Sequence, residues 1–193
     1  MLPKATPERL TAFSDGVFAV LITVLVLDLH PPAGPTFASL LSHWPSWLSY
    51  AVSYLFIALV WVNHHHVMRY ATATTSYLMW LNFAHLFAMS LLPLATAWMA
   101  ESRLAPQPVA FYATVFFLVN ATYLALILEL VVPAQGFDIP PKVLRIMRLR
   151  ALVSLGFFGL AAIVALWVPL AGLGICVACL AFYLRPEPPG VAA

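Results

Sequence analysis

Charged residues are scarce in this sequence. Only 8% of the 193 residues are Asp, Glu, Lys or Arg, whereas a soluble domain has about 25%. The net charge of +2 is too small for a nucleic-acid-binding surface. The two cysteines lie in one apolar run and say nothing about a redox compartment. These shortages exclude most soluble proteins and a nucleic-acid partner.

The chain consists mainly of apolar sequence, with 63% hydrophobic residues. A membrane-spanning helix needs about 20 mostly apolar residues. Six candidate segments cover residues 11–29, 46–67, 77–100, 108–131, 151–168 and 170–184. The break at Trp167, Val168 and Pro169 is the weakest, but residues 151–184 are too long for one crossing, so we expect two helices there. We predict an all-α integral membrane protein with one six-helix domain over residues 1–185 and a short cytoplasmic tail over residues 186–193.

The basic residues indicate how the predicted spans are oriented. With six spans, eight of the nine Lys and Arg residues fall on the side of the two termini, and only Arg103 falls on the other side. Basic residues gather in cytoplasmic loops. Both termini are therefore predicted to be cytoplasmic.

Polar residues occur at one membrane depth on three of the predicted helices. They are Ser14 and Asp15 on the first helix, His64 and His65 on the second, and Asn82 on the third. Polar side chains inside a membrane usually face protein or water. We therefore expect a buried network in which Asp15 and Ser14 meet the histidines and Asn82. Whether this network only locks helix packing or has a further role stays open.

Three adjacent histidines, His64, His65 and His66, raise the question of a metal site. Consecutive residues of a helix point about 100° apart, so at most two of the three side chains reach one ion. No cysteine or second histidine pair lies at that depth, and we predict no metal site and no cofactor. The chain also lacks a nucleophile–base pair, a phosphate loop and paired carboxylates, so we do not expect an enzyme.

One stripe on the first predicted helix has the spacing of either a pore wall or a packing face. Val20, Thr23, Val24 and Leu27 follow the i, i+3, i+4, i+7 pattern. Symmetry-related copies of such a stripe would form a hydrophobic constriction, but ordinary helix packing produces the same periodicity. Asp28 ends this helix on the outside, where it either attracts cations at a pore mouth or is simply solvated.

The start of the first helix resembles the R-x-x-x-F-S-D signature of the transmembrane protein 175 family of potassium channels. All four fixed positions match, at Arg9, Phe13, Ser14 and Asp15. The similarity extends to the end of the second segment and into the third, through Trp61, His64, His65, Asn82 and Pro93. Members that resemble this chain have one six-helix repeat and assemble as homotetramers.

The resemblance also implies roles for individual residues. Four copies of the first helix would surround the ion path, with a constriction at Val20, five residues after Asp15. The hydroxyl associated with selectivity falls on Thr23, and further apolar layers fall on Val24 and Leu27. The motif residues would hold the first helix against the second and third rather than contact the ion.

We therefore expect a potassium-preferring cation channel in the cell (plasma) membrane. Its partners would be membrane lipid, permeant potassium ions and three further copies of the chain in a homotetramer. The chain lacks the T-V-G-Y-G carbonyl filter of ordinary potassium channels, so strong selectivity does not follow. A proton-coupled transporter that uses Asp15 and the histidines as a relay stays open as the alternative.

Overall fold

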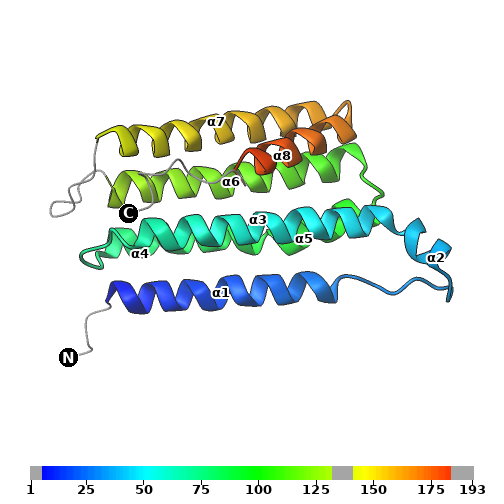
Figure 1. Cartoon of the computed structure of the whole chain (residues 1–193), viewed down its shortest axis with the longest axis horizontal. Coiled ribbons are helices and arrows are strands. Elements are labelled where there is room, and N and C mark those ends of the chain that lie inside the picture. The colour runs from blue at the N-terminus through cyan, green and yellow to red at the C-terminus, as the bar shows by residue number, and fades with distance from the viewer. Residues whose placement is uncertain (1–5, 132–140, 184–193) are drawn as a thin grey trace.

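The computed structural model describes residues 6–131 and 141–183, and every regular element among them is a helix. The helices lie roughly along one direction in a bundle (Figure 1). In chain order they are α1 (Pro7–Leu27), α2 (Phe37–Ser42), α3 (Trp44–Met68), α4 (Ser76–Ser90), α5 (Leu92–Glu101), α6 (Pro106–Leu130), α7 (Pro141–Ala165) and α8 (Pro169–Tyr183).

Local sequence signals set the starts of these helices. The side chain of Thr6 caps α1 by accepting a hydrogen bond from the backbone N–H of Arg9. The side chain of Thr75 caps α4 by accepting one from the backbone N–H of Leu78. Proline occupies the first or second position of α3, α5 and α6, where its missing N–H costs nothing. Five of the six predicted segments begin within four residues of an observed helix start, but the segment predicted from residue 151 forms α7, which begins ten residues earlier, at Pro141.

The third predicted segment is interrupted. Its residues form α4 and α5, which together run from Ser76 to Glu101 with a break at Leu91. Pro93 explains the break, because it cannot donate the hydrogen bond that Met89 would accept in a continuous helix. The short α2 was not predicted, because its six residues are far too few to register as a span.

The break between the last two helices is confirmed, since α7 ends at Ala165 and α8 begins at Pro169. The two helices pack closely. A Cβ atom added to Gly172 would lie only 2.6 Å from the Cβ of Ala165 and 2.8 Å from the carbonyl oxygen of Ala161, so only glycine fits there.

In the part of the chain that the structure describes, five helical segments are long and apolar enough to cross a membrane, and this confirms a multi-pass membrane protein. The predicted sixth span forms α8, which is apolar but has only 15 residues. At a rise of 1.5 Å per residue such a helix is about 22 Å long, against a hydrocarbon core of about 30 Å. The sixth crossing therefore stays a prediction.

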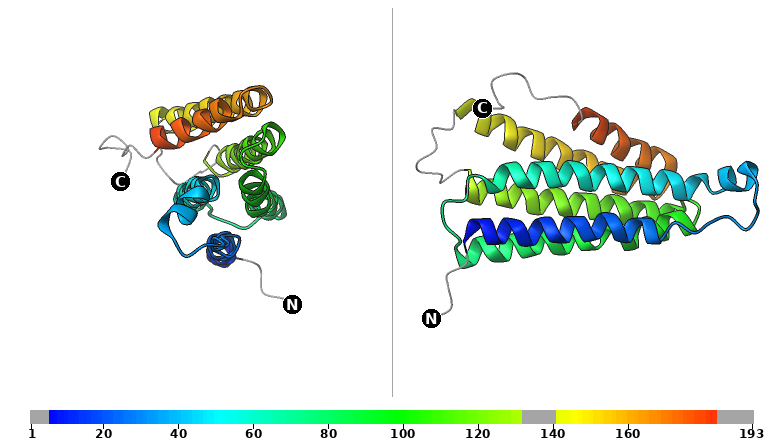
Figure 2. Two further views of the ribbon diagram at one scale, coloured as in Figure 1. Left: turned by 90° about the vertical axis from the view of Figure 1, so that its right-hand side faces the viewer. Right: turned by 60° about the horizontal axis from the view of Figure 1, so that its bottom comes forward.

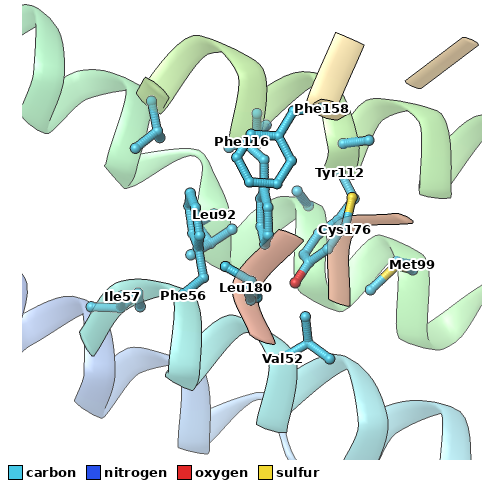
Figure 3. Packing of buried hydrophobic residues seen from close by; sticks show 14 of the residues in the cluster. Val52, Phe56, Ile57, Leu92, Met99, Tyr112, Phe116, Phe158, Cys176 and Leu180 are labelled. Carbon is cyan, nitrogen blue, oxygen red and sulfur yellow. The ribbon is translucent and has the colours of Figure 1, made fainter. Parts of the chain in front are cut away.

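The core lies around α6, which packs against α3, α4, α5, α7 and α8. Phe56 of α3 stacks on Phe116 of α6 with ring centroids 3.6 Å apart, and Phe158 of α7 meets both rings edge-on (Figure 3). In contrast, α1 lies at the edge of the bundle, where it packs against α3, α4 and α5 (Figure 2). This position leaves much of the α1 surface uncovered.

Candidate functional site

A buried hydrogen-bonded chain joins α1, α3 and α4. The amide nitrogen of Asn82 donates to the hydroxyl of Ser14 at 2.9 Å, and its carbonyl oxygen lies 2.7 Å from Nε2 of His64. All three side chains are fully buried. Because an amide oxygen can only accept, Nε2 of His64 carries the proton and donates. Ser14 in turn donates to the backbone carbonyl of Leu10 at 2.9 Å.

A second buried histidine lies against the first. The rings of His64 and His85 are stacked, with centroids 5.5 Å apart and planes inclined by 7°. Nδ1 of His85 is 2.9 Å from the hydroxyl of Thr122 on α6. That hydroxyl donates to a backbone carbonyl, of Leu118 or Val119, so Nδ1 of His85 is the donor of the pair. Among the described atoms, His64 Nδ1 and His85 Nε2 are buried without a hydrogen-bond partner.

Asp15 is not part of the buried hydrogen-bond network of Ser14, Asn82 and His64. Its carboxylate accepts a hydrogen bond of 2.8 Å from the indole N–H of Trp61, near the surface of the bundle. The expected hydrogen bond from Asp15 to a histidine or to Asn82 is not formed in the described structure, where Trp61 is the hydrogen-bond partner of Asp15. Neighbouring helical residues point about 100° apart, so the rotation that buries Ser14 turns Asp15 toward the edge between α1 and α3.

The remaining motif residues lie outside the buried chain. Phe13 is half exposed and packs edge-to-face on Phe83 of α4, with centroids 5.8 Å apart. His65 is exposed and its ring lies 5.9 Å from that of Trp61. Arg9 is exposed in the first turn of α1. The structure thus places Phe13, Ser14 and Asp15 against α3 and α4, each through a different contact.

The predicted stripe on α1 faces away from the bundle. The buried face consists of Leu10, Ser14, Phe18, Leu21 and Leu25. On the opposite side Val20 is 59% exposed, Leu27 is 76% exposed and Thr23 is exposed between them. Val24 lies at the edge of this stripe and is half-buried, and Asp28 is exposed at the helix end. Among residues 6–131 and 141–183, no other helix packs on the face that carries Val20, Thr23 and Leu27.

Sequence reasoning missed two pairings in this region. The Asp15–Trp61 bond had a signal in the sequence, because Trp61 lies one helical turn before His64 and therefore on the same side of α3. The His85–Thr122 bond had none, because it depends on how α6 is rotated. The described residues contain no group of three or more His, Cys, Asp or Glu side chains placed to hold a metal ion.

Known proteins resemble this chain along most of its length. Residues 9–93 match the family described as endosomal/lysosomal potassium channel TMEM175. A potassium channel of Chryseobacterium is 30% identical over 94% of both chains, and a potassium channel of Streptomyces collinus is 37% identical over 77% of this chain and 78% of its own. The chain belongs to the TMEM175 family. Its relatives are ion channels rather than enzymes, as predicted.

Solved TMEM175 structures share the fold. The crystal structure of a lysosomal potassium-selective TMEM175 homolog from Chamaesiphon minutus matches with a TM-score of 0.82 and 26% identity, over 92% of this chain and 95% of that one. The chicken relative is described as an endosomal/lysosomal proton channel; it is 35% identical over 46% of this chain but only 20% of its own length. The TMEM175 relatives thus carry two descriptions of the permeant ion.

Proposed function

We propose that four copies of this chain surround a potassium-permeable pore, with α1 of each copy at the centre. One helix cannot enclose a pore, so the exposed face of α1 needs symmetry-related copies to become a pore wall. The observation that carries this proposal is the uncovered stripe of Val20, Thr23 and Leu27 on a helix that is otherwise anchored to the bundle. The potassium channels among the relatives support the choice of ion.

Within this pore, Val20 forms the narrowest ring. Four branched apolar side chains offer a potassium ion no replacement for its hydration shell, so a narrow ring of them excludes water and resists conduction. Leu27 forms a second apolar layer toward the outside. Val24 contributes less to the pore wall, because neighbouring helices of its own bundle partly cover it. Thr23 supplies the only hydroxyl between these layers and donates its proton to the backbone carbonyl of Val20 at 2.8 Å, which leaves its oxygen free to face an ion.

The buried chain of Ser14, Asn82 and His64 has a structural role in this proposal. It ties α1 to α3 and α4 on the side opposite to the pore stripe, and so sets the rotation of α1 that presents Val20 to the axis. Phe13 and Asp15 support the same orientation from the two flanks.

We further propose six crossings, cytoplasmic termini and insertion in the plasma membrane. Arg9, Arg69 and Arg145 lie at the end of the bundle where α1 and α7 begin, and Arg103 lies at the other end (Figure 1). This asymmetry supports a cytoplasmic location for the end that carries three of these arginines. A helix as short as α8 crosses where the bilayer thins around it.

Currents of the purified protein in planar bilayers test the channel. At equal pH on both sides we expect a current that reverses at the potassium equilibrium potential. Val20→Asn puts four amides at the ring and should raise the potassium current severalfold. Val26→Asn is the matched control, because Val26 is also an exposed valine of α1, at 47% exposure, on a different side of the helix. A rise with Val26→Asn but not with Val20→Asn would mean that α1 is rotated from the proposed register.

A proton pathway is the second candidate, favoured by the description of the vertebrate relatives and by the two buried histidines with unpartnered ring nitrogens. In potassium-free solutions with a pH gradient, a proton-conducting pore gives a current that reverses at the proton equilibrium potential. A proton-coupled transporter instead carries potassium only while a proton gradient exists. The same recordings therefore separate the three mechanisms.

A further inference from the structure

The first turns of α7 combine two arginines with an apolar stripe. The membrane-spanning part of α7 runs from Leu144 to Ala165, so Arg145 and Arg148 lie at the start of the span. After Arg145, one line of exposed residues recurs at helical spacing and is almost entirely large and apolar: Leu149, Leu152, Gly156, Leu160 and Ile163. The four large side chains are each about half exposed, and α7 lies in the outer layer of the bundle (Figure 1). This face has the form of a surface that meets lipid.

The two arginines lack an anionic partner in the described part of the chain. Arg145 is exposed, and Arg148, one turn further along, is half-buried with its Nε atom fully buried and without a hydrogen-bond partner. A membrane protein needs positive charge on one side for topology, but a loop would satisfy that need. Two guanidinium groups one turn apart at the bilayer surface fit an oxyanion that accepts several N–H bonds, and phosphate is the one that a bilayer supplies there.

We propose that Arg145 and Arg148 bind the phosphate of an anionic phospholipid whose acyl chains lie along the stripe from Leu149 to Ile163. A headgroup with net negative charge is favoured over a zwitterionic one, because the site has no carboxylate to pair with a choline ammonium group and its two guanidinium groups repel one. The proposal does not depend on the pore or on which face of the bilayer this end of α7 occupies. It adds a lipid of defined charge to the partners of the chain.

Native mass spectrometry of the full-length protein in detergent tests the site. The protein is titrated with phosphatidylglycerol or with phosphatidylcholine of the same acyl chains, and bound lipid is counted as adducts. We expect tighter binding of phosphatidylglycerol, weakened about fivefold by Arg145→Gln or Arg148→Gln and about 25-fold by the double variant. The double variant with lysine at both positions keeps the charge and should keep most of the preference, which guards against a loss that merely reflects misfolding.

Two matched controls localise the effect. Arg103→Gln removes one charge at the opposite end of the bundle, and Arg69→Gln removes one at the same end but at the close of α3. Both should bind phosphatidylglycerol like the unmodified protein. Equal binding of the two lipids, or an equal loss with Arg69→Gln, would overturn the proposal. It also fails if soluble glycerol phosphate displaces the lipid at millimolar concentration, since the stripe would then contribute nothing, or if the double glutamine variant changes the oligomeric state instead of the number of adducts.

Discussion

Replacing Asn82 with leucine tests whether the buried chain between α1, α3 and α4 stabilises the bundle. Leucine is similar in size but offers no hydrogen bond, so the substitution removes the contacts at 2.7 Å to His64 and at 2.9 Å to Ser14. Ser14 still donates to the carbonyl of Leu10 and loses only the hydrogen bond that it accepts from Asn82. Such a bond between membrane helices is worth about 0.6 kcal/mol. The proton on Nε2 of His64 is left buried and unpaired, at a cost of about 1–3 kcal/mol. We expect Asn82→Leu to lower the free energy of unfolding by about 2–4 kcal/mol in total.

A double-mutant cycle isolates the contribution of the His64–Asn82 bond. When both partners become leucine, no buried N–H is left unpaired, so the double variant should be about 1–2 kcal/mol less destabilised than the sum of the single variants. Titration with SDS in mixed micelles, followed by far-UV circular dichroism, measures each free energy of unfolding. The matched control is Asn63→Leu, because Asn63 is a half-buried asparagine of α3 that makes no hydrogen bond to another described residue. Additive effects of the two substitutions, or an equal loss with Asn63→Leu, would refute the reasoning.

Substitutions at three further places test other parts of the structure. Asp15→Ala and Trp61→Phe remove the same hydrogen bond, so each should cost about 0.6–2 kcal/mol and the double variant should be no less stable than the worse single variant in the same SDS titration. Gly172→Ala should cost about 1–3 kcal/mol because its Cβ would overlap Ala165, whereas Gly174→Ala, with no atom within 4 Å of its added Cβ, should be neutral or slightly stabilising in the same titration. Thr23→Ala should leave a current but reduce discrimination between potassium and sodium, seen as a shift in reversal potential under mixed-ion conditions.

The depth of the polar residues could be predicted from the sequence, but not all of their partners. Alternating helix directions bring Ser14, His64 and Asn82 to one level, and the structure joins these three. The depth of Asp15 is almost that of Ser14, yet its partner is Trp61. Depth follows from counting residues along a span, whereas the choice of partner follows from rotation about the helix axis, and a shift of one position turns a side chain by about 100°.

The fold shows the same division. The break between α7 and α8 could be predicted because Pro169 acts on the local backbone and because residues 151–184 are too long for one crossing. The interruption at Leu91 was not predicted, although Pro93 was visible, because a proline inside an apolar run either bends a helix or divides it, depending on what packs around it. The covering of Val24 by its own bundle likewise depends on the position of neighbouring helices and not on its spacing from Val20.

The close contact at Gly172 has a consequence for how the protein enters the membrane during synthesis. A three-residue connection, from Leu166 to Val168, separates α7 from α8, so the two helices leave the ribosome almost together. A helix of 15 residues is a poor insertion signal by itself. If α8 first packs against Ala161 and Ala165, the two helices form one apolar hairpin, and α8 enters the lipid together with α7. We therefore expect a side chain at position 172 to impair insertion of α8 as well as the packing of the finished bundle.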